Sequence, residues 1–146
     1  MDEFERDLNE NKKAVEGARE ALLGRLRRLG DQDLLRVRRG GWSVQEVLRH
    51  VIDAEVSYTR VVAHLRGLPL QVADPLAEDV ASIGASIAAL ERYRTTLMAS
   101  VEGVDEATFY EMRTLGREQY SVMSVLENVA DHDHEHLGQI AKTVGA

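Results

Sequence analysis

Cysteine is absent from this 146-residue chain. The protein therefore cannot form a disulfide framework, an iron–sulfur cluster, a thiolate metal site or a cysteine nucleophile of its own. Any thiol chemistry would need a thiol supplied from outside the chain. Proline is also scarce, at Pro69 and Pro75, and strand-like alternation of apolar residues is weak. The sequence is thus poor in the signals that indicate sheets or thiol chemistry.

Long hydrophobic runs and an overall basic charge are missing as well. No stretch approaches the roughly 18 apolar residues that a membrane span needs. The charged N-terminal segment, residues 1–7, has no apolar core of the kind found in signal peptides. We therefore expect a cytoplasmic protein without a membrane partner. The net charge of −7 disfavours nucleic acid as the main partner, because phosphate binding needs a basic surface.

A local basic cluster is the exception to this acidic charge. It consists of six arginines, Arg25, Arg27, Arg28, Arg36, Arg38 and Arg39. In one interpretation they end the first helix, where positive charge suits the helix dipole, and continue into an exposed loop. In the other they lie near a site for an anionic ligand.

Apolar residues recur at three- and four-residue steps in four segments, which predicts four amphipathic helices. We expect them at about residues 2–29, 43–67, 74–101 and 121–143. The second begins with Ser43 and Glu46, which can form a capping box. The third begins near Pro75, because proline is tolerated in the first turn of a helix. Arg94 fills one position of the third helix where the pattern expects an apolar residue.

The chain length fits one domain, residues 1–146, with a core large enough to be stable without cross-links. Four helices with one apolar face each can bury these faces against one another, which predicts an all-α four-helix bundle. Two connections, residues 68–74 and 103–120, are long. The second is expected to hold a short helix or a small hairpin and could cover an opening in the bundle.

His132 and His136 are the most informative pair of residues. On an α-helix, residues four apart project from one face, so two imidazoles can bind one metal ion. Val129 and Ile140 continue the same face, so the pair points toward the expected core, where polar rings need partners. His134 lies about 200° around the helix from His132 and should face solvent.

His50 is a third candidate ligand, on the apolar stripe of the second predicted helix. Three neutral imidazoles leave coordination positions open, as in catalytic metal sites. Zinc suits such a site, and nickel, iron or manganese could also bind. The acceptors for the second ring nitrogens would be Glu46 or Asp53 for His50, or Asp133. The alternative is a charged or hydrogen-bonded patch on the last helix, with His50 a satisfied core histidine. His64 lies over three turns beyond His50 and is not expected in the site.

Two motifs carry a resemblance to a known family. They are Trp42-Ser43-Val44-Gln45-Glu46-Val47-Leu48-Arg49-His50, and the segment from Tyr120-Ser121-Val122 to His132-Asp133-His134-Glu135-His136-Leu137-Gly138-Gln139-Ile140. The chain resembles the DinB-like superfamily, which includes the YfiT-type proteins and thiol-dependent S-transferases, over nearly its whole length. The resemblance implies the metal ligands His50, His132 and His136, an up-down-down-up bundle and often a homodimer. Leu137 departs from the arginine of many relatives, and this change would remove an anion contact.

The resemblance implies a divalent-metal-dependent enzyme, with zinc or nickel as the cofactor. It would act on a small-molecule substrate by activating a water or an exogenous low-molecular-weight thiol such as bacillithiol or mycothiol, as an S-transferase or a hydrolase. The alternative is a non-catalytic dimeric bundle with a structural or vestigial metal site, because the sequence offers no obvious second catalytic group. Leu23 and Leu48 are candidates for the dimer interface.

Three further residues have two interpretations each. Trp42 would cap the end of the bundle or stack on a substrate. Tyr58 and Tyr120 would be core residues with exposed hydroxyls or proton donors near the metal. Gln139 is expected to form a hydrogen bond at the end of the bundle, without a catalytic role.

Overall fold

The computed structural model describes residues 1–145. In it the chain folds as a bundle of helices. Within these residues the four long helices are α1 (Glu3–Leu26), α2 (Val44–Arg66), α3 (Ile83–Val101) and α5 (Val122–Val144). The shorter elements are the 3-10 turns η1 (Asp31–Leu35) and η2 (Ala77–Val80), the one-turn helix α4 (Glu106–Tyr110), and the strands β1 (Arg113–Leu115) and β2 (Glu118–Tyr120). The prediction of an all-α four-helix bundle is confirmed.

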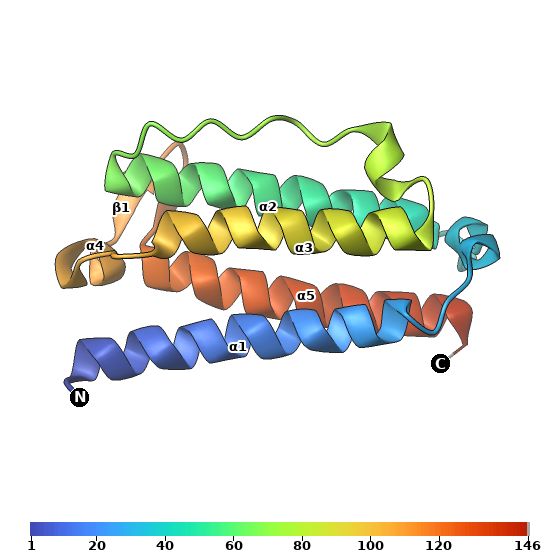
Figure 1. Cartoon of the computed structure of the whole chain (residues 1–146), viewed down its shortest axis with the longest axis horizontal. Coiled ribbons are helices and arrows are strands. Elements are labelled where there is room, and N and C mark those ends of the chain that lie inside the picture. Colours follow the sequence, from blue (N-terminus) through green and yellow to red (C-terminus); the bar gives the residue numbers. More distant parts are fainter. Residues whose placement is uncertain (146) are drawn as a thin grey trace.

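The long helices follow the up-down-down-up course. Helices α1 and α5 run in one direction, and α2 and α3 run in the other (Figure 1). Helix α5 packs against both α1 and α2, and α2 also packs against α3. Since α2 and α5 are antiparallel neighbours, the first half of α2 lies opposite the second half of α5.

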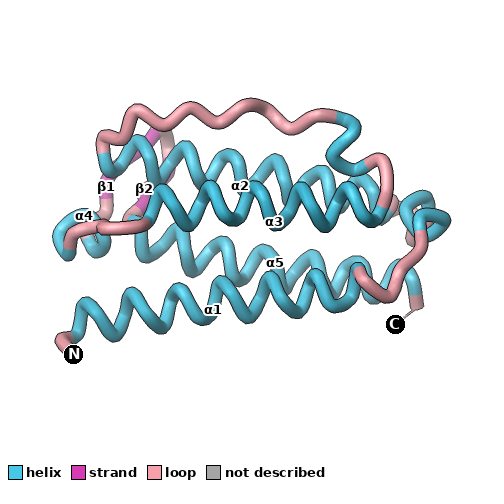
Figure 2. The backbone as a smooth tube through the Cα atoms, in the orientation of Figure 1, coloured by secondary structure: helices cyan, strands magenta, loops and turns pink. Residues whose placement is uncertain are grey.

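The connection between α2 and α3 traverses the length of the bundle, because these two helices are parallel (Figure 2). Most of it is extended, so the prediction of a helix from residue 74 is wrong. Asp79 accepts a hydrogen bond from the Leu76 N–H at 3.0 Å, which stabilises the η2 turn instead. Helix α3 then begins at Ile83, capped by Ser82, whose hydroxyl accepts from the Ala85 N–H at 2.9 Å.

The connection between α3 and α5 contains both of the elements that were expected as alternatives. Helix α4 is followed by the antiparallel hairpin β1–β2, in which Arg113 pairs with Tyr120. This segment lies at the end of the bundle where α3 ends and α5 begins (Figure 1). This segment does not line the cavity described below. Among residues 1–145, the loop that lines that cavity is the one before α2.

The interior contains two apolar clusters with a layer of charge between them. Each long helix contributes one residue to this layer, and all four are at most 8% exposed: Arg19, Glu55, Arg94 and Asp133. Arg19 Nε and Arg94 Nη2 both donate to Asp133 Oδ2, at 3.1 and 2.9 Å. Arg94 Nε donates to Glu55 Oε1 at 2.8 Å. We call these four residues the ion cluster.

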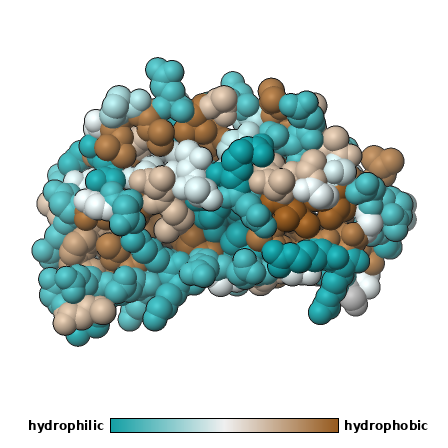
Figure 3. All heavy atoms as spheres, in the orientation of Figure 1, coloured by the Kyte–Doolittle hydropathy of each residue, from teal (hydrophilic) through white to brown (hydrophobic). Residues whose placement is uncertain are grey.

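The surface is mostly hydrophilic on the face shown in Figure 3, with hydrophobic atoms visible between α3 and α1. Leu23 and Leu48 are buried inside the bundle, at 2% and 0% exposure. The expectation that they form a dimer interface is therefore wrong. Among the helices of residues 1–145, we find none whose length and apolar content would suffice to cross a membrane.

Candidate metal centre

The first ligand candidate, His50, lies near the start of α2. A complete capping box fixes this start, since the Ser43 hydroxyl accepts from the Glu46 N–H and Glu46 Oε1 accepts from the Ser43 N–H, both at 3.1 Å. An isolated bridge between Val37 and Ser43 ties the preceding loop to the helix start. The phase of α2 is thereby set so that His50 points toward α5.

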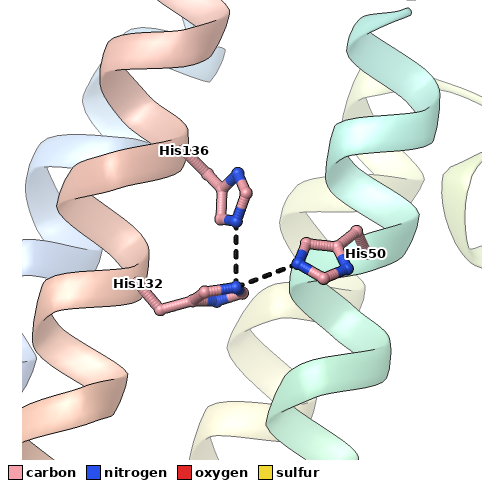
Figure 4. A group of neighbouring side chains, drawn as sticks. All are labelled: His50, His132 and His136. Carbon is pink, nitrogen blue, oxygen red and sulfur yellow. Dashed lines mark hydrogen bonds between the residues drawn. The ribbon is translucent and has the colours of Figure 1, made fainter. Parts of the chain in front are cut away.

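The structure brings all three predicted ligand candidates together. Figure 4 shows His50 on α2 facing His132 and His136 on α5. His132 Nε2 lies 3.1 Å from His50 Nε2 and 2.9 Å from His136 Nε2. One nitrogen from each ring lies within 4.8 Å of the other two. We call these three residues the histidine triad.

Gln139 selects the tautomer of a neutral His136 ring. His136 Nδ1–H donates to Gln139 Oε1 at 2.7 Å, so the neutral ring presents a lone pair at Nε2. This lone pair points at His132 Nε2, which is also close to His50. If His132 Nε2 carries a hydrogen, that hydrogen can form only one linear hydrogen bond. If His132 Nε2 carries none, its lone pair faces the lone pair of His136 Nε2 and the contact is repulsive. Hydrogen bonding alone therefore satisfies only one of the two close contacts.

A cation fits this donor set better than a proton does. An ion about 2.0–2.1 Å from each imidazole nitrogen holds the nitrogens roughly 3.0–3.4 Å apart. The observed separations of 2.9 and 3.1 Å are close to that range. All three lone pairs would then point at positive charge. The three histidines could therefore hold a divalent metal ion.

The protonation of the rings also suits metal binding. Burial, followed by the neighbouring imidazoles of His136 and His50, lowers the pKa of His132 to about 4. Burial, followed by His136, lowers the pKa of His50, against smaller raising effects of Asp53 and Glu135. Both rings are thus neutral near pH 7, which is the form that binds metals.

The histidine triad opens onto a cavity of about 890 Å³. The loop before α2 forms one wall with Arg38, Gly40, Gly41 and Trp42, and the second half of α5 forms the other. The Trp42 ring packs edge-on against His50, with 5.1 Å between ring centroids, and is 44% exposed. Trp42 therefore lies at the cavity wall with part of its ring exposed.

Comparison with protein families matches residues 14–140 to the DinB superfamily. The chain belongs to this superfamily. A solved structure described as "Crystal structure of TT2238, a four-helix bundle protein" is 27% identical in sequence. The match covers 92% of this chain and 98% of that chain, with a TM-score of 0.67. A search of curated proteins gave no match.

The acceptors expected for the ligand candidates of this DinB-superfamily protein are occupied elsewhere. Glu46 caps α2, Asp53 pairs with Arg49 at 3.3 Å, and Asp133 belongs to the ion cluster. The acceptor that sequence reasoning missed is Gln139. Its spacing from His136, three residues along the helix, places the two side chains on adjacent turns and could have indicated the contact.

The remaining candidates lie around or outside the histidine triad. His134 is exposed, as predicted, and it also lines the cavity. His64 is exposed and lies outside the triad and the cavity lining. Tyr58 packs edge-on near His132, with 6.4 Å between ring centroids. Burial, with Tyr120 and Glu135 adding to it, raises the pKa of Tyr58, so its phenol stays protonated at neutral pH. Leu137 packs against the apolar core.

Proposed function

We propose that this protein is a divalent-metal-dependent enzyme that uses His50, His132 and His136 as its metal ligands. The reaction would be of the S-transferase or hydrolase type, with a low-molecular-weight thiol or a water as the nucleophile. The observation that carries the proposal is the convergence of three Nε2 atoms at the wall of an open cavity. Zinc and nickel are the ions that best suit three imidazoles and an open position.

The open cavity favours catalysis over a structural role for the metal. Structural zinc sites are closed by four protein ligands, whereas catalytic sites keep a position for water or substrate. The ion would supply a Lewis acid that activates the nucleophile at neutral pH. The dimeric, non-catalytic alternative would leave the cavity beside the histidine triad without a use.

The residues of the chain have separate roles in this proposal. Gln139 holds the His136 ring in the tautomer with a lone pair at Nε2. Trp42 covers His50 on the cavity side and provides an apolar surface for the substrate. The absence of cysteine means that a thiol nucleophile would come from solution.

The test is turnover by protein reconstituted with zinc or nickel. Electrophilic substrates would be screened with bacillithiol, mycothiol and glutathione, and ester and amide substrates would be screened with water alone. We expect metal-dependent turnover with at least one class, abolished in His132→Ala and retained in His64→Ala, since His64 is exposed and does not line the cavity. Reconstituted protein that turns over no substrate of either class would support the non-catalytic alternative.

A further inference from the structure

The charged residues of the cavity differ in sign from the protein as a whole. The chain carries a net charge of −7. The cavity, however, is lined by Arg38 and Lys142 and by a single carboxylate, that of Glu135. The histidine side chains carry no negative charge, and a divalent ion would add two positive charges. The cavity is therefore a positive region on a negative protein.

Arg38 and Lys142 have no carboxylate partner among residues 1–145, although many other basic residues do. Arg36 pairs with Asp33 and Arg27 with Glu20, at 3.4 and 3.7 Å. Arg38 and Lys142 are both exposed and line the same cavity, so both are available to a ligand. A ligand anion there would form charge-assisted hydrogen bonds with both.

The charges are arranged along the cavity in a defined order. Lys142 lies seven residues after Glu135 on α5, which places the two on the same face about 10.5 Å apart. Glu135 lies beside the histidine triad, where its charge acts on His50 and His132. Lys142 is therefore at the other end of the α5 wall, away from the triad. A bound anion would place its charge at that end and its uncharged part beside Trp42 and the triad.

We propose that the cavity binds a small anionic substrate with an aromatic or other apolar body, and that Arg38 and Lys142 select its charged group. This inference rests on the proposed function, because it names the substrate class of the same cavity. The anionic group is a carboxylate or a phosphate. The apolar body would pack against the exposed part of Trp42.

Trp42 makes the test direct, because it is the only tryptophan in the chain and it lines the cavity. Its fluorescence would be titrated with benzoate, phenylphosphate and the uncharged benzamide, in metal-free and zinc-loaded protein. We expect saturable responses to at least one anion, with benzamide at least about fivefold weaker. A fivefold change in affinity is about the upper end of what one exposed ion pair contributes to binding. The stronger of the two anions identifies the carboxylate or the phosphate.

Matched variants assign the selectivity to residues. Arg38→Gln and Lys142→Gln should each weaken binding of the anion about fivefold and leave benzamide unchanged. Arg39→Gln removes the same charge from the neighbouring residue, which is outside the cavity lining, and should alter binding by less than about twofold. Equal binding of benzoate, phenylphosphate and benzamide, or equal effects of Arg38→Gln and Arg39→Gln, would overturn the proposal.

The experiment distinguishes failure of the metal proposal from failure of the anion proposal. If zinc does not bind but metal-free protein still selects anions through Arg38 and Lys142, the proposed metal chemistry fails and this inference stands. If zinc binds at the histidine triad but no anion perturbs Trp42 in either form, the metal proposal stands and this inference is wrong.

Discussion

The ion cluster and the histidine triad are neighbouring groups of polar residues in the same bundle, and they are satisfied in opposite ways. In the ion cluster two arginines face two carboxylates, and each guanidinium also donates to a main-chain carbonyl, of Leu90 or Val15. In the histidine triad three rings of the same kind face one another. The ion cluster pairs opposite charges within the chain, whereas the histidine triad contains no opposite charge and could hold a metal ion.

From this difference we infer a structural role for the ion cluster and a binding role for the histidine triad. Buried charges are tolerated when they are paired and hydrogen-bonded. All four members of the ion cluster are paired and hydrogen-bonded, although Glu55 Oε2 has only an ion-pair contact with Arg19 Nη2, at 3.0 Å. It lies between the two apolar clusters, where it joins all four long helices. The triad is partly exposed to the cavity. We infer that the ion cluster fixes how the helices pack, and that the triad uses the resulting geometry.

The largest expected effect comes from breaking the ion cluster. Arg94→Ala leaves Glu55 and Asp133 with Arg19 as their only cation in the cluster, so one buried negative charge is uncompensated. We expect a loss of about 3–5 kcal/mol in the free energy of unfolding. Chemical denaturation of metal-free protein would measure it. The control is Arg49→Ala, whose exposed pair with Asp53 should contribute at most about 1 kcal/mol. Equal losses in the two variants would contradict a structural role for the cluster.

Removing a member of the triad should have the opposite effect, with a large loss of metal affinity and little loss of stability. His132→Ala deletes the ring that contacts both other histidines, so zinc affinity should fall by more than about 100-fold, the upper limit for loss of a supporting hydrogen bond. Metal-free stability should change little, because no matched buried charge is lost. Competition with a metal chelator, beside elemental analysis, measures the affinity. His134→Ala on the same helix is the control, and an equal loss there would remove the distinction between the histidines.

Gln139 provides a smaller and more specific test. Gln139→Leu removes the acceptor for His136 Nδ1–H, and zinc affinity should fall by about 10- to 100-fold. Gln139→Glu keeps an acceptor oxygen and should retain the affinity. If both variants lose affinity equally, the effect arises from packing and the hydrogen bond is not what orients His136.

Acid titration tests whether His132 is neutral in the folded protein. A histidine in an unfolded chain has a pKa near 6.5, and folded His132 has a pKa of about 4. Between these values the unfolded chain binds a proton that folded His132 does not, so acidification through this range destabilises the metal-free fold. NMR titration should give a low midpoint for His132, and His132→Ala should lose less stability on acidification than wild type. A midpoint at or above that of free histidine would contradict the buried, neutral triad.

Much of the fold could be predicted because the apolar periodicity of the long helices is strong. The start of α3 could not, since Pro75 is compatible with a first helical turn and only the side chains of Asp79 and Ser82 decide otherwise. The ion cluster was also missed. Arg94 on the apolar stripe was a visible signal, but its partners lie on other helices and depend on tertiary packing.

The three ligand candidates could be proposed from helical spacing and from the two family motifs. Their surroundings could not, because Glu46, Asp53 and Asp133 compete for several partners within reach. Residues 103–120, which were expected to be able to cover an opening in the bundle, do not line the cavity. One wall is formed by Arg38, Gly40, Gly41 and Trp42 before α2, and the position of this loop depends on the Val37–Ser43 bridge and the cap at Ser43.

Whether a metal ion is held by the histidine triad is tested most directly by anomalous X-ray diffraction from crystals of the zinc-reconstituted protein. The account predicts one strong peak about 2.0–2.1 Å from Nε2 of His50, His132 and His136, with Gln139 still accepting from His136. Zinc bound only elsewhere on the protein, with the three rings remaining in contact with one another, would contradict it.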